Sequence, residues 1–197
     1  MTPATVPFVR RISGATLLSV VLISPACERA PVIGPDAVPA AGVSGGGANQ
    51  APDTPATLNA QLAELRALTA RFHDLDEAMA AGYTVLVTPC LALPGTGAMG
   101  FHYGNPAYIN DPAVNYLQPE LLLYEPQKNG KLRFVGVEYI IPFALLPSTA
   151  TPPTLLGQTM HTDFAGNLWA LHAWVGRHNP AGMFADWNPK VSCEFAS

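Results

Sequence analysis

Two ionisable residues interrupt apolar runs of the chain, and both are of types that carry chemistry. Glu138 lies in KLRFVGVEYII and His172 lies in LWALHAWV. In a strand, alternation puts Glu138 on one face with small or apolar neighbours, namely Leu132, Phe134, Gly136 and Ile140. Because an isolated buried carboxylate is costly, Glu138 must be paired, protonated, metal-bound or exposed at a rim.

His172 poses the same question on a second predicted strand. Alternation puts it on a face with Leu168, Ala170 and Trp174. A buried neutral imidazole is tolerated when both ring nitrogens find partners, so a satisfied core histidine is one interpretation and a ligand is the other. If Glu138 and His172 project to the same side of one sheet, each supplies the partner that the other needs.

His102 is the third candidate, in the glycine-rich passage GTGAMGFHYGNP. The glycines allow unusual backbone angles, so we expect a loop that folds over a site; a surface histidine on a structural loop is the alternative. The stretch GTGAMG at 95–100 has the GxGxxG spacing, but no predicted helix follows it and it lacks the lysine of a phosphate-binding loop, so it is not a nucleotide-binding fingerprint.

We therefore predict a ligand- or metal-binding set of His102, Glu138 and His172. A His-His-Glu set suits zinc or another divalent ion. Copper is a second possibility, because Met99, Met160 and Met183 lie near histidines in the sequence and thioethers favour Cu(I). Methionine also fills gaps in cores, which leaves the cofactor unassigned.

Catalytic residues are not assigned by any motif, since the chain has no HExxH and its GxSxG match, GVSGG at 42–46, lies within the expected flexible tether. An acid–base hydrolase or isomerase that uses Glu138 with His172 is one alternative function, and a carboxylate pair of Glu120 with Glu138 is a variant of it. The other alternative is a structural or interaction lipoprotein in which these residues are internal polar anchors.

The N-terminus has the pattern of an export signal. Arg10 and Arg11 precede the apolar run 12–23, and small residues at 24–26 come directly before Cys27. We expect a signal peptide at 1–26, a flexible Pro/Gly/Ala-rich tether at 27–56 and one globular domain at 57–197. Lipidation of Cys27 would anchor the protein to a membrane, whereas a plain cut after Ala26 would release it, so the predicted location is periplasmic or membrane-anchored.

Composition agrees with an exported domain. The formal net charge is −4 and charged residues make up 12%, so the chain has no basic surface for nucleic acid. Cys90 and Cys193 form an even pair once Cys27 is set aside, which predicts a disulfide in an oxidising compartment. Two buried thiols or a metal-thiolate site are the alternatives.

The expected fold class is α+β, with an N-terminal helix packed on a small, mostly antiparallel sheet and long Pro/Gly-rich loops. The helical spacing begins after Thr57, a possible cap, and ends at Gly82, with a break expected near Asp74. The expected strands cover 83–87, 120–125, 131–141 and 168–175, and Asn129-Gly130 marks the turn of a hairpin.

Four stretches resemble a group of exported bacterial proteins of uncharacterised function. They are ARFHDLDEAMAAGY, GAMGFHYGNP, PELLLYEPQKNGKLRFVGVEYIIP and LHAWVGRHNPAGMFADWNPKVSC, within roughly residues 66–193. The resemblance implies a single secreted or lipid-anchored domain and brings no activity, cofactor or catalytic residue.

Overall fold

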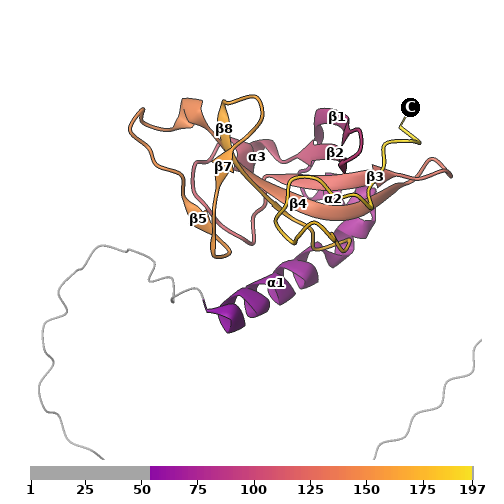
Figure 1. The fold of residues 1–197 in the computed structure, drawn as a ribbon, viewed down its shortest axis with the longest axis horizontal. Coiled ribbons are helices and arrows are strands. Elements are labelled where there is room, and N and C mark those ends of the chain that lie inside the picture. Colours follow the sequence, from indigo (N-terminus) through magenta and orange to yellow (C-terminus); the bar gives the residue numbers. More distant parts are fainter. Residues whose placement is uncertain (1–53, 197) are drawn as a thin grey trace, which may run out of the picture. The chain divides into compact units, whose positions relative to one another are not determined.

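A computed structural model describes residues 54–196, and these form a helical N-terminal segment followed by an antiparallel sheet (Figure 1). The fold is α+β, as the sequence predicts. The expected signal peptide, most of the tether and Cys27 lie outside the described residues. None of the described helices is both long enough and apolar enough to cross a membrane.

The N-terminal segment consists of α1 (Pro55–Thr69), a 3₁₀ turn (Ala70–His73) and α2 (Leu75–Ala80). The prediction that Thr57 caps the helix is wrong, because Thr54 is the N-cap and its hydroxyl accepts a hydrogen bond from the Thr57 N–H at 3.2 Å. The break near Asp74 is confirmed: this residue caps α2 and accepts the backbone N–H of Asp76 at 3.0 Å.

The main sheet has six strands in the order β1-β2-β3-β4-β8-β7, and every neighbouring pair is antiparallel. Its strands are β1 (Val85–Leu93), β2 (Gly97–Gly104), β3 (Leu121–Pro126), β4 (Leu132–Pro142), β7 (His161–Thr162) and β8 (Leu168–Ala173). The connections hold α3 (Pro106–Ile109), a 3₁₀ turn (Phe143–Leu145) and a small ribbon of β5 (Thr154–Leu155) with β6 (Gln158–Thr159).

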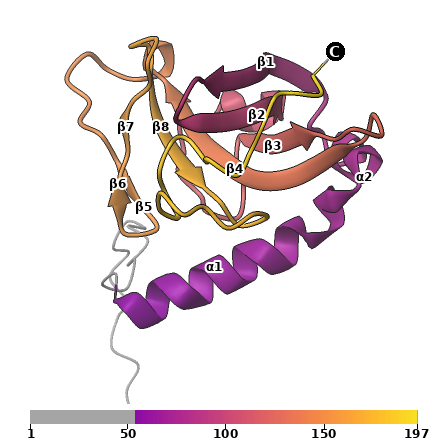
Figure 2. The same cartoon turned by 45° about the vertical axis from the view of Figure 1, so that its right-hand side comes forward.

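The larger hydrophobic core lies between one face of this sheet and the helices. Figures 1 and 2 both show α1 running along that side of the sheet. The core joins helical and strand residues, among them Leu62, Leu65, Leu122, Tyr124, Val137 and Leu171. The opposite face of the sheet is the one that carries Glu138.

The hairpin of β3 and β4 is confirmed, and all six residues of β3 are buried, as expected for a central strand. Strict alternation fails in β4, however, because the pairing register shifts between Leu123 and Tyr124. The shift is a β-bulge at Val135, which turns Phe134 into the helix-side core while Val135 packs in a second cluster with Trp174. The prediction that Phe134 shares a face with Glu138 is therefore wrong.

The glycine-rich passage is a strand and not the expected loop. It forms β2, which pairs with β1 on one side and β3 on the other. Gly100 has a φ of +93°, and a Cβ there would lie 2.4 Å from the Tyr124 carbonyl oxygen. Here glycine allows two strands to approach closely, so it positions His102 within the sheet.

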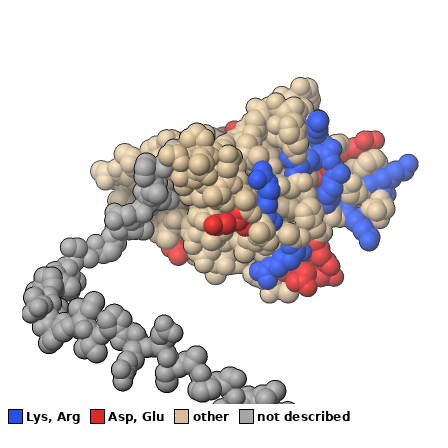
Figure 3. Space-filling view, turned by 90° about the horizontal axis from the view of Figure 1, so that it is seen from below, with Lys and Arg blue, Asp and Glu red and all other residues tan. Residues whose placement is uncertain are grey.

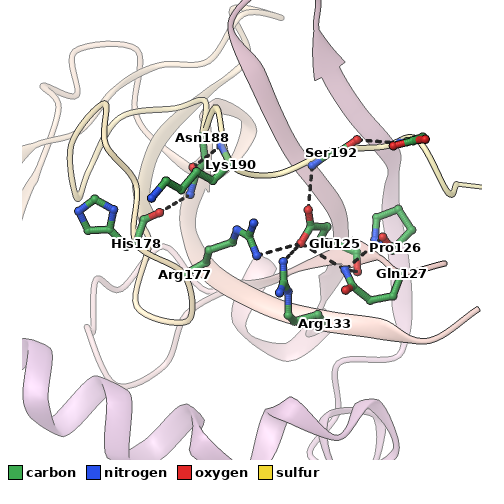
Figure 4. A network of polar contacts seen from close by, with 10 residues as sticks. Glu125, Pro126, Gln127, Arg133, Arg177, His178, Asn188, Lys190 and Ser192 are labelled. Atoms are coloured by element: carbon green, nitrogen blue, oxygen red, sulfur yellow. Dashed lines mark hydrogen bonds and ion pairs between the residues drawn. The ribbon is translucent and has the colours of Figure 1, made fainter. Parts of the chain in front are cut away.

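The C-terminal segment is fastened to the sheet at two points. The predicted disulfide joins Cys90 on β1 to Cys193, with the two Cα atoms 5.7 Å apart. Beside it, the buried carboxylate of Glu125 accepts the Ser192 N–H at 3.0 Å and forms ion pairs with Arg133 and Arg177 (Figure 4). These contacts hold the chain that follows β8 across the sheet face on which Glu138 lies.

Candidate metal centre

The structure brings His102, Glu138 and His172 together from three strands. Glu138 on β4 lies directly opposite His172 on β8. His102 on β2 lies opposite Leu123 of β3, which in turn lies opposite Gly136, two residues before Glu138. Directly opposed residues project to the same side of a sheet, so all three side chains emerge on one face.

Each imidazole is directed at a different oxygen of the carboxylate. The His102 Nε2 lies 3.3 Å from Glu138 Oε2, and the His172 Nε2 lies 3.8 Å from Glu138 Oε1. The three residues each offer one ligand atom within 4.8 Å of the other two. Donor atoms around a tetrahedral ion at about 2.0–2.2 Å are roughly 3.3–3.6 Å apart, so the cluster is slightly wider than a closed site.

All three residues are buried, with exposed fractions of 2% for His102, 8% for Glu138 and 2% for His172. Burial raises the pKa of the Glu138 carboxyl, and the nearby His172 opposes this rise. A carboxylate in such a place needs a positive partner, which a protonated imidazole or a cation can supply.

Thr88 supports His102 from β1, where the two residues are paired across the sheet. The Thr88 Oγ1 lies 2.6 Å from the His102 Nδ1 in a hydrogen bond. Burial, together with His172, lowers the pKa of His102 to about 3, so its ring is neutral near pH 7. When Nδ1–H donates to Thr88, the lone pair of Nε2 is available to a ligand on the side of Glu138.

Asp186 supports His172 from the C-terminal segment, with its Oδ1 3.4 Å from the His172 Nδ1. Neither ring nitrogen of His172 has a hydrogen bond within the part of the chain that the structure describes. Burial alone would lower the pKa of His172, but Glu138 and Asp186 act against it and raise the pKa above its ordinary value. His161 on β7 contacts the same Asp186 oxygen at 3.0 Å.

A pocket opens over the cluster and is lined by all three of its residues. Its empty space is about 660 Å³, part of which is open solvent. Thr88, His161 and Asp186 also line it, so the supporting residues reach the same space. The arrangement is a buried set of nitrogen and oxygen donors with one accessible side.

Other residues singled out in the sequence lie elsewhere. Glu120 is buried, its Oε2 accepts the Ile140 N–H at 3.1 Å, and it is not a member of the cluster. Met99 lines the pocket, whereas Met160 lies in the helix-side core and Met183 is half-buried against the apolar clusters. The methionines therefore do not gather around the histidines.

Three neighbours of the cluster were not predicted, namely Thr88, His161 and Asp186. Thr88 lies on β1, His161 lies on the two-residue strand β7, and Asp186 lies in an irregular tail. Their sequence spacing from the cluster gives no signal, because only strand order and the path of the tail bring them there.

Comparisons of the chain with models of protein families, with curated proteins and with solved structures found no match.

Proposed function

We propose that this protein is an exported cell-envelope domain that binds one divalent metal ion through His102, Glu138 and His172. The observation that carries the proposal is the orientation of the two histidines. Each directs Nε2 toward Glu138, while an oxygen from Thr88 or Asp186 lies beyond its Nδ1. A hydrogen bond like the one between Thr88 and His102 fixes the ring and the tautomer of a metal-binding histidine, and Asp186 lies at ion-pair distance from the ring of His172.

The donor set favours zinc or a similar divalent ion over Cu(I). Two imidazole nitrogens and a carboxylate oxygen are borderline to hard donors, whereas Cu(I) prefers thiolates and thioethers. The set has three protein ligands and an accessible side, which is typical of zinc sites that also bind a small ligand or water. The predicted export signal and the disulfide support a location outside the cytoplasm.

The test is metal binding by protein purified without a histidine tag and stripped with a chelator. We expect about one equivalent of Zn²⁺ by elemental analysis after dialysis, and an affinity measured against a chromophoric chelator. His102→Ala, Glu138→Ala and His172→Ala should each weaken binding at least about 100-fold, because each removes a ligand. His178→Ala is the matched control, since His178 is exposed and outside the cluster. The proposal is contradicted if the wild type binds no Zn²⁺ and the three alanine variants behave as it does in the same titration.

Acid–base catalysis by Glu138 and His172 is a second candidate function, and one observation favours it. The pocket reaches both side chains, so a small substrate has access to them. This function needs no ion, so any turnover found for it should survive removal of metal by a chelator. Loss of turnover on chelation would instead favour the metal site.

A further inference from the structure

The walls of the pocket above the cluster are mainly apolar. They combine residues from β1, β2, β3 and β4 and from the start of β8, namely Val87, Leu91, Met99, Leu121, Ile140 and Leu168. The polar lining residues include the three members of the cluster and their supports. A polar floor with apolar walls is the usual composition of a site for a small organic molecule.

The charge of the lining disfavours an anion. Asp163 and Asp186 line the pocket together with Glu138, and no described Lys or Arg does. Carboxylates and phosphates are usually recognised by Arg or Lys in protein sites. On the face that Figure 3 displays, Lys and Arg gather at the end where the β3–β4 hairpin lies in Figure 1.

An exposed aromatic side chain stands among the lining residues. Phe164 is 78% exposed, although it lines the pocket. The turn that carries it is fixed by the Asp163 carboxylate, which accepts the backbone N–H groups of Ala165, Asn167 and Leu168 at 3.1–3.3 Å. An apolar ligand that covers a solvent-exposed aromatic ring beside a pocket is bound more tightly, because apolar surface is removed from water.

We infer that the pocket binds an uncharged, largely apolar small molecule that coordinates the metal through one donor atom, with its apolar part against the walls and Phe164. This inference rests on the proposed metal site and adds the chemical class of its ligand. The metal ion compensates Glu138 and accepts the donor atom. The apolar walls supply the remaining affinity.

The experiment compares three probes that share one donor group, using Co²⁺-loaded protein at about pH 8, where an imidazole is uncharged. The probes are imidazole, 4-phenylimidazole and 4-(imidazol-4-yl)benzoate. We expect 4-phenylimidazole to bind at least about tenfold more tightly than imidazole, because its phenyl ring is buried against the walls. The benzoate should bind at least about tenfold more weakly than 4-phenylimidazole, and the visible Co²⁺ spectrum should change on binding.

The variant Phe164→Ala should weaken 4-phenylimidazole binding at least about threefold without changing the affinity for metal. Phe195→Ala is its matched control, because Phe195 is also exposed, at 43%, but does not line the pocket. Equal affinities for the three probes, or a preference for the benzoate, overturn the inference while the metal site stands. If the preceding metal titration shows no Co²⁺ or Zn²⁺ binding, the proposed function and this inference fail together.

Discussion

Glu138 and His172 lie directly opposite each other on β4 and β8, with Glu138 Oε1 3.8 Å from His172 Nε2. Both side chains are buried, and neither nitrogen of His172 has a hydrogen bond among the described residues. Glu138 and Asp186 lie near the ring of His172 without hydrogen-bonding to it. A cation between the Glu138 carboxylate and the His172 Nε2 would give both groups a partner.

The first prediction separates a metal site from an internal polar anchor. Glu138→Gln should leave the metal-free protein as stable as the wild type or more stable near pH 7. Removing the charge ends the cost of burying a carboxylate, and His172 can lose its proton without leaving an orphan charge. Urea unfolding of the chelator-treated proteins measures the difference. A loss of about 3 kcal/mol or more would favour the anchor.

The second prediction concerns the support of His102. Thr88→Val keeps the shape of the side chain but removes the oxygen that contacts the His102 Nδ1. We expect zinc affinity to fall about 10- to 100-fold, because the ring loses the contact that fixes its tautomer. Thr84→Val is the control, since Thr84 is exposed and does not line the pocket. Unchanged affinity in Thr88→Val would show that the hydroxyl does not support the site.

Much of the fold could be predicted because local signals dominate it. Asn129-Gly130 predicts the hairpin turn, and the break near Asp74 follows from its capping side chain. The prediction of a loop at β2 was wrong, because glycine is common both in flexible loops and where two strands approach closely. The bulge at Val135 leaves no sequence signal, so the faces of β4 were predicted correctly only beyond it.

The sequence predicts the cluster only if the strands that carry its residues are neighbours in one sheet. Alternation shows which residues share a face within a strand, but it does not show which strands are neighbours. The meeting of Glu138 with His172 depends on the pairing of β4 with β8, which are separated by a long connection. Asp186 could not be predicted at all, since its position depends on the path of an irregular segment.

The third prediction uses Glu120, which lies outside the cluster. Burial raises the pKa of its carboxyl from 4.5 to about 8. The folded state therefore binds a proton more tightly than the unfolded state does, so the associated stability is present below about pH 4.5 and is lost as the pH rises through about 8. In Glu120→Gln this fall should be absent, a difference on the order of 5 kcal/mol between the two ends of the window. Urea unfolding at several pH values measures it, and parallel pH profiles for variant and wild type would contradict the assignment.

The fourth prediction concerns the disulfide, which joins residues separated by 103 positions. The double variant Cys90→Ser/Cys193→Ser should lose about 2–5 kcal/mol of unfolding free energy, because its unfolded chain is no longer constrained. Denaturant unfolding measures the loss. A loss below about 0.5 kcal/mol would show that the contacts of Glu125 hold the C-terminal segment on the sheet without the disulfide.

The disulfide also connects the two supports of the histidines. Cys90 lies two residues after Thr88 on β1, and Cys193 lies in the segment that carries Asp186. A reductant that opens this one bond would loosen both outer oxygens at once, so binding of the proposed ion would depend on the redox potential of the surroundings. The centre would then be strongest in an oxidising compartment and weakest where thiols are kept reduced.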